Sequence, residues 1–145
     1  MSKITKVIAR QVFDSRGNPT IEAEVFASNT SCSAICPSGA STGTYEAFEK
    51  RDFKNKKYLG KSVLGPINTI NKIVSKKLKN LNIHNQERID YTLINLDGTK
   101  QKKKLGANSI LAISMAAKKL SSKIKKKPLF STFLLKKNFK MPYPL

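Results

Sequence analysis

The stretch with the most chemical potential is Pro37 to Ala47, with the sequence PSGASTGTYEA. Its glycines leave backbone N–H groups accessible. Its serine and threonine hydroxyls could bind a phosphate, attack a carbonyl or coordinate a metal ion. Each of these chemistries needs its own spacing and its own partners elsewhere in the chain.

Phosphate binding by a Walker-type loop requires a lysine directly after the second glycine. Gly39 and Gly43 are four positions apart and Thr44 follows, so the pattern is absent. Residues 39–43 do match the Gly-x-Ser-x-Gly motif of a hydrolase elbow, but that elbow also needs a parallel sheet with acid and histidine partners. His84 is the only histidine and falls in a polar stretch, so we expect a surface residue and no catalytic triad.

A metal site made by this chain alone is not indicated either. The nine carboxylates form no paired cluster with metal-ligand spacing. Cys32 and Cys36 lack a His/Cys cluster for zinc and are too far apart along a strand for an easy disulfide, so we expect two buried thiols. A glycine-bearing loop on a rigid sheet is typical of a mobile lid, which could offer amides and one serine oxygen to an anionic substrate and a hard cation.

The elements before the loop read as strands. Residues 3–13, 20–27 and 31–36 are rich in β-branched and apolar side chains, and the turn residues 14–19 (DSRGNP) join the first two strands into a hairpin. The second strand alternates apolar residues with glutamates, which is typical of a strand with one buried face.

The elements after the loop read as helices. Apolar residues recur every three or four positions over 63–78 and 107–125. A shorter helix is predicted over 87–94, and one or two helical turns over 129–135. Gly65 is expected to cap the first of these helices. Strands followed by helices predict an α+β domain, a three-stranded antiparallel sheet with helices packed on one face.

The net charge of +19 raises the possibility of a nucleic-acid partner. Four of the 28 basic residues are arginine and the other 24 are lysine, which occurs beside abundant asparagine and isoleucine. All three have AT-rich codons, so we interpret the charge mainly as a composition effect. The alternative, a stand-alone basic interaction domain that binds nucleic acid or a partner protein, stays open.

Targeting signals are not apparent. No apolar run approaches the ~20 residues of a membrane span, and the first residues lack the unbroken apolar core of a signal peptide. We expect a cytoplasmic protein with no membrane partner.

Seven segments, taken together and in order, resemble the N-terminal domain of enolase: residues 13–25, 37–47, 49–52, 58–63, 95–99, 106–116 and 141–144. The resemblance covers essentially the whole chain. It implies that residues 1–140 form a capping domain. Residues 141–145 are then expected to begin a linker to a C-terminal β/α barrel that this chain lacks.

The resemblance implies a function for the intact protein. Enolase (phosphopyruvate hydratase) is a glycolytic lyase that reversibly dehydrates 2-phosphoglycerate to phosphoenolpyruvate, with two Mg²⁺ ions in each active site. Enediolate stabilisation by Mg²⁺ beside a Lys or His base is the known chemistry of its superfamily. The barrel supplies the acid and the base, so this chain is expected to hold no catalytic residue and to be inactive alone.

The resemblance also implies roles for individual residues. Ser41 would bind the second Mg²⁺ through its hydroxyl and carbonyl oxygens, and Arg10 and Glu22 would form ion pairs across a homodimer interface. The lid around Ser41 would comprise Gly39, Ala40, Thr42 and Gly43. Bacterial members of the family also join RNA-degrading complexes, and some members occur at the cell surface as well as in the cytoplasm.

Overall fold

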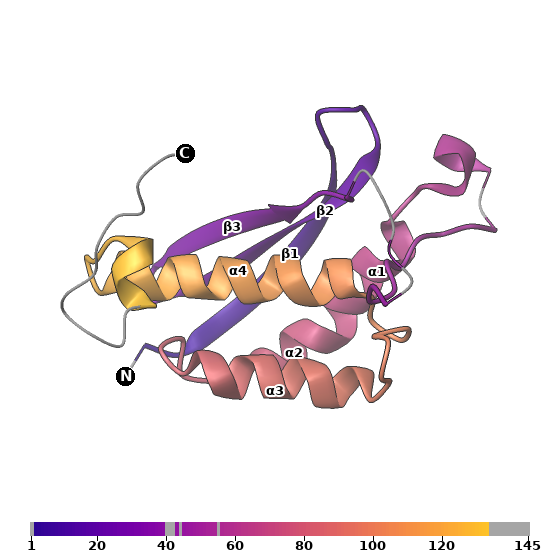
Figure 1. Ribbon diagram of the computed structural model, residues 1–145. Coiled ribbons are helices and arrows are strands. Elements are labelled where there is room, and N and C mark those ends of the chain that lie inside the picture. The colour runs from indigo at the N-terminus through magenta and orange to yellow at the C-terminus, as the bar shows by residue number, and fades with distance from the viewer. Residues whose placement is uncertain (1, 40–42, 44, 55, 134–145) are drawn as a thin grey trace.

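The computed structural model describes residues 2–39, 43, 45–54 and 56–133. Its sheet has three antiparallel strands in the order β1-β2-β3 (Figure 1). Their bounds are β1 Ile4–Phe13, β2 Pro19–Ala27 and β3 Thr30–Cys36. All three predicted strands are confirmed to within one residue.

The sheet has one buried face. Ile21, Ala23 and Val25 of β2 are fully buried, whereas Glu22 and Glu24 between them are half-buried on the opposite face. The period-2 pattern therefore oriented β2 correctly, because successive side chains of a strand point to opposite faces.

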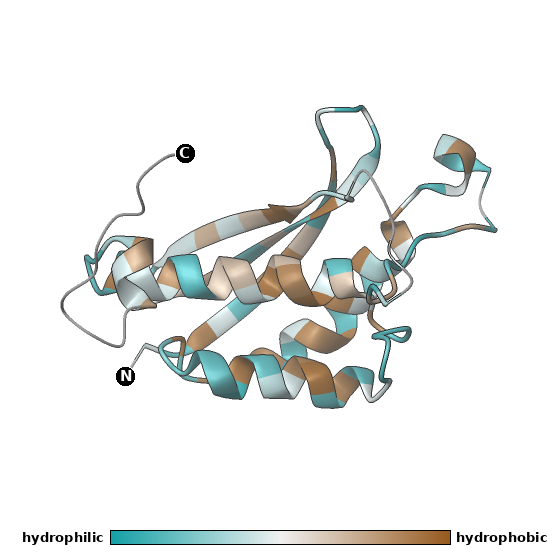
Figure 2. Ribbon diagram, viewed as in Figure 1, coloured by the Kyte–Doolittle hydropathy of each residue, from teal (hydrophilic) through white to brown (hydrophobic). Residues whose placement is uncertain are grey.

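Seven helical segments follow the strands. They are η1 Lys57–Gly60, α1 Leu64–Thr69, η2 Ile70–Val74, α2 Ser75–Leu78, α3 Gln86–Asp97, α4 Ala107–Ile124 and η3 Leu129–Thr132 in the described part of the chain. α4 packs on β2 and β3, η2 and α2 pack along β1, and α3 forms an outer layer against α4 and α2 (Figure 1). Figure 2 shows hydrophobic and hydrophilic segments alternating along the strands and helices, with a mostly hydrophilic turn between β1 and β2. The predicted α+β architecture is confirmed.

The first predicted helix differs in detail. One continuous helical run starts at Leu64, but its middle, η2, is π-helical. The predicted Gly65 cap is wrong, since Val63 precedes the first turn as its N-cap. Gly65 N instead donates to both carboxylate oxygens of Asp52, at 3.2 and 3.0 Å. A Cβ at Gly65 would lie 2.4 Å from Asp52 Oδ1, so the glycine allows a close approach.

Side chains from the helices close the edge of β1. The Asn71 amide pairs with Ala9 as a peptide would: Ala9 N donates to Oδ1 at 2.7 Å and Nδ2 donates to Ala9 O at 3.1 Å. Ser75 Oγ accepts from Val7 N at 3.0 Å. A row of unpaired backbone groups on an edge strand invites association, and these contacts occupy three of the edge groups of β1.

Two lysines of α4 reach the other edge of the sheet. Lys119 Nζ donates to Ser33 O at 3.5 Å and Lys123 Nζ donates to Ser31 O at 3.1 Å. Lysine on an exposed edge strand hinders pairing with another chain. Two lysines of the excess that we interpreted as a composition effect therefore make specific contacts with β3.

The two cysteines are free thiols, half-buried against the core, whereas we expected buried ones. Burial and the nearby Glu49 raise the pKa of the Cys36 thiol.

Among the described residues, no helix combines the length and apolarity that crossing a bilayer requires.

Candidate functional site

The loop singled out by the sequence leaves β3 at Cys36, as expected. Of the five predicted lid residues, the structure describes Gly39 and Gly43, both exposed. Ala40, Ser41 and Thr42 lie outside the described residues. The candidate site is therefore built from the side chains that hold the two ends of the loop.

Arg16, at the tip of the β1–β2 hairpin, holds the start of the loop. Its Nη2 donates to the carbonyl oxygens of Ser38 at 2.7 Å and of Gly39 at 3.3 Å. The hairpin turn and the loop are more than twenty residues apart in the sequence, and this one guanidinium joins them.

Arg51 joins the same loop to three further segments, and only 9% of its side chain is exposed. Its Nη2 donates to Ser38 Oγ and to Glu49 Oε1, both at 2.7 Å. Its Nη1 donates to the carbonyl oxygens of Pro19, at 2.9 Å, and Lys61. Ser38 Oγ in turn donates to the Glu49 carboxylate. A planar guanidinium can serve several acceptors at once in this way.

Asp14 holds the hairpin turn that carries Arg16. Its Oδ1 accepts from the backbone N–H groups of Arg16 and Asn18, both at 2.9 Å. The bond from Asn18 outweighs the effect of burial, and together with Arg16 it lowers the pKa of Asp14 below its usual value. Oδ2 is buried without a hydrogen bond, 3.9 Å from Arg16 Nη2. The turn is thus fixed by an ionised carboxylate.

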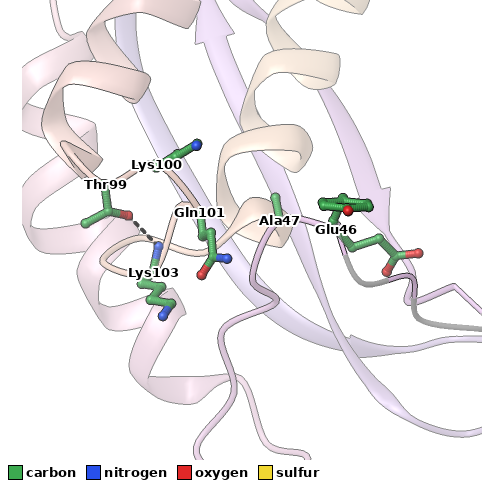
Figure 3. A pocket seen from close by; sticks show the side chains of 7 residues that line it. Glu46, Ala47, Thr99, Lys100, Gln101 and Lys103 are labelled. Atoms are coloured by element: carbon green, nitrogen blue, oxygen red, sulfur yellow. Dashed lines mark hydrogen bonds between the residues drawn. The ribbon is translucent and has the colours of Figure 1, made fainter.

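The far end of the loop is tied to the segment before α4. Phe48 N donates to Gln101 O at 2.8 Å, and Ala107 N donates to Phe48 O at 2.8 Å. Between these segments is a cavity of about 620 Å³, where the two chain segments face each other (Figure 3). It is lined by Tyr45, Glu46, Ala47, Thr99, Lys100, Gln101 and Lys103.

Asp97 shapes the segment opposite the loop. Its Oδ2 accepts from the buried Leu105 N at 2.7 Å and its Oδ1 accepts from Thr99 N at 3.0 Å. Burial alone would raise the pKa of Asp97, but these hydrogen bonds outweigh it and lower the pKa. An ionised, nearly fully buried carboxylate therefore organises the turn after α3.

Arg10 and Glu22, predicted at a homodimer interface, face each other within one chain. The register of β1 and β2 places them opposite each other, and Arg10 Nη1 lies 3.2 Å from Glu22 Oε2. Arg10 also pairs with Glu24, and the pKa of Glu24 is lowered by hydrogen bonds from Ser31 and Arg10. All of these charges are on the sheet face away from the helices, so a role at an interface stays a prediction.

Sequence reasoning missed Ser38, Glu49, Arg51 and Asp97 as structural partners of the loop. The only available signal was the charged run Glu49 to Asp52, which places two basic residues between two acids. That signal names no partner outside the segment.

The described residues contain no cluster of metal-ligating side chains. Among these described residues, no group of three or more His, Cys, Asp or Glu side chains could hold a metal ion. Ser41, the predicted Mg²⁺ ligand, lies outside the described residues, and its role stays a prediction.

His84 differs from the surface residue that we expected. It is half-buried, and its Nδ1 is 2.9 Å from Ser121 Oγ on α4. Burial, assisted by the positive charge of Lys125, lowers its pKa. Its polar flanking residues gave no sign of this contact, because Ser121 is 37 positions away.

The His84 environment predicts a pH-dependent stability. A pKa lowered by folding means that the unfolded chain binds the proton more tightly. The free energy of unfolding should be fully retained above the unfolded value of about 6.5 and should decrease as pH falls through the folded pKa. Urea unfolding between about pH 7.5 and 5.5 would measure this decrease, which His84→Gln should flatten. Equal pH slopes for the two proteins would refute the interpretation.

The comparisons with known proteins agree with the motifs. The family model described as "Enolase, N-terminal domain" matches residues 4–133. An enolase of Pelagibacter ubique is 73% identical over 145 residues, which is 100% of this chain and 35% of that protein. Enolase B of Dictyostelium discoideum is 45% identical over 97% of this chain and 32% of its own length.

An enolase of Methanosarcina acetivorans is 46% identical over 98% of this chain and 33% of its own length. The chain thus spans about a third of the length of these relatives. The matched region contains the whole sheet, all the helices of the described part and the loop with its anchoring side chains. The chain belongs to the enolase N-terminal domain family.

Proposed function

We propose that this chain is the capping part of an enolase that reversibly dehydrates 2-phosphoglycerate to phosphoenolpyruvate with Mg²⁺. A C-terminal barrel would supply the acid and the base, and residues 37–47 would close over the substrate. The observation that carries the proposal is the anchoring of Ser38 and Gly39 by Arg16 and Arg51. A loop fixed at its base on a rigid sheet can present its interior to a second domain in a defined direction.

The chemistry of the residues supports assigning the acid and the base to the barrel and the loop contacts to this chain. All nine carboxylates lie in the described part, and seven of them already serve structural contacts. The other two are Glu46, inside the loop, and Glu87 on α3. The proposal assigns the metal contact to the Ser41 oxygens and the substrate contacts to backbone N–H groups of the loop. When bound, Mg²⁺ would neutralise charge that grows on the substrate as its α-proton leaves.

We further propose that the intact enzyme is a cytoplasmic homodimer, with the open face of the sheet at the interface. In the described part of the chain this face carries no helix, and it presents Arg10, Glu22 and Glu24 together with Ile35, which is 45% exposed. Arg10 is 48% exposed and could exchange a partner within the chain for one on the second subunit. Membership of an RNA-degrading complex stays a prediction.

The substitution Ser41→Ala tests the proposal. The test uses a fusion enzyme, this chain continued by the remaining part of the 73% identical relative. Loss of the hydroxyl should lower the rate at limiting Mg²⁺ and raise the Mg²⁺ concentration needed for half-maximal rate. High Mg²⁺ should restore much of the rate, because the carbonyl ligand remains. The melting temperature should hardly change, since such surface changes usually cost less than about 0.5 kcal/mol.

Ser41→Thr is the matched control, because it keeps a hydroxyl at the same position. It should stay closer to the wild-type Mg²⁺ dependence than Ser41→Ala does. If Ser41→Ala keeps the wild-type rate and Mg²⁺ dependence, residues 37–47 do not bind metal as proposed. If the unmodified fusion enzyme has no activity on 2-phosphoglycerate, the function itself is wrong.

A further inference from the structure

We propose that Arg16 is a positioning residue, which sets the direction in which the 37–47 loop leaves the sheet; this inference rests on the proposed function. Its Nη2 spans two consecutive carbonyl oxygens, those of Ser38 at 2.7 Å and Gly39 at 3.3 Å. Two consecutive carbonyl oxygens held by one nitrogen of a planar guanidinium define the orientation of the peptide between them.

Arg16 is itself held in place by Asp14. Asp14 Oδ1 accepts from the backbone N–H of Arg16, and Asp14 Oδ2 lies 3.9 Å from the guanidinium. Asp14 is 3% exposed, and the hydrogen bond that it accepts from Asn18 fixes the same turn. Contacts therefore run without a break from the buried Asp14 side chain through Arg16 to Gly39. Along the covalent backbone, Arg16 and Gly39 are separated by the whole of β2 and β3.

Arg16 and Arg51 have different roles. Arg51 is 9% exposed and binds four segments, so its loss would disturb the fold. Arg16 is 47% exposed. Contacts of exposed charges contribute little to global stability, so the Arg16 contacts should affect the loop base and leave the domain intact.

A first measurement tests the local constraint in this chain alone. NMR order parameters for the amide of Gly39 should fall in Arg16→Gln, toward the values below about 0.6 that mark flexible backbone. Gly106, at the start of α4, serves as the internal reference and should not change. Arg88→Gln, at an exposed position on α3, is the matched control. An unchanged Gly39 would overturn the inference.

A second measurement tests the consequence for the fusion enzyme. If Arg16 only selects the loop direction that binds substrate and Mg²⁺, its loss lowers the fraction of protein molecules with the loop in that direction. The apparent affinity for both ligands then falls by the same factor. KM for 2-phosphoglycerate and the Mg²⁺ half-saturation should both rise in Arg16→Gln, by roughly the tenfold expected for one charge-assisted hydrogen bond. kcat at saturation should be retained, and the melting temperature should move by about 2 °C or less.

Arg16→Lys should give an intermediate KM, because an ammonium group is a point charge without the planar fork. A lower kcat with unchanged KM, or a large fall in melting temperature, would indicate a structural role and overturn the inference. An inactive unmodified fusion enzyme would instead refute the proposed function. In that case the Gly39 order parameters still decide whether Arg16 fixes the loop base.

Discussion

The 145-residue chain by itself should give no measurable turnover of 2-phosphoglycerate. An acid or base contributes typically ~10²–10⁴-fold to a rate, and the proposal assigns both to a barrel outside this chain. Several groups that could substitute for them are engaged: His84 is bonded to Ser121, and Asp14, Glu49 and Asp97 hold turns and loops. Formation of phosphoenolpyruvate, followed by its ultraviolet absorbance, is the measurement.

The fusion enzyme is the positive control for this experiment, at the same molar concentration and in the same Mg²⁺ buffer. Activity of the fusion enzyme together with inactivity of the chain is the expected pair of results. Turnover by the purified chain, above that of a heat-denatured sample, would show that the described residues contain an acid–base pair that the proposal denies.

The substitution Gly106→Ala should cause a large loss of stability. Gly106 has φ +90° and ψ 138°, a region that residues with a side chain rarely adopt, at a cost of about 1–3 kcal/mol. Its new Cβ would also lie 2.5 Å from Lys50 Cβ and 2.4 Å from Asn108 Oδ1. Overpacking of this kind adds about 1–3 kcal/mol. The contact is hard to relax, because Lys50 N and O both bond the Asn108 side chain.

Thermal unfolding should therefore show a decrease of roughly 5–15 °C for Gly106→Ala, at about 2–4 °C per kcal/mol. Gly98→Ala is the matched control. Gly98 also has a positive φ, +68°, but its new Cβ would find only Asn95 O at 3.7 Å. It should lose only about 1 kcal/mol. Equal losses at the two glycines would mean that the contact with Lys50 relaxes freely, contrary to the packing described here.

Much of the fold could be read from periodicity. The alternation in β2 and the apolar stripe of α4 follow from geometry that repeats along each element, so a local pattern is enough to orient them. The turn residues 14–19 predicted the hairpin for a similar reason, since turn chemistry is local. The family could be identified from motifs, which need no coordinates.

Features that depart from the regular geometry of a helix or strand could not be predicted from periodicity. The π-helical turn η2 and the contact of Gly65 with Asp52 depend on what the neighbouring loop places against the helix. The half-buried state of His84 depends on Ser121 of α4 in the same way.

By itself, the sequence determined the order of the elements, their buried faces and the position of the glycine- and hydroxyl-rich loop, because each of these depends on residues close together in the chain. Only the tertiary structure decided what holds that loop. Ser38 meets Arg16 across 22 positions and Arg51 across 13, and the β1–β2 register brings Arg10 to Glu22. Such contacts connect side chains on different elements, and their distances follow from how the hairpin, sheet and loops pack, which no local pattern of residues specifies.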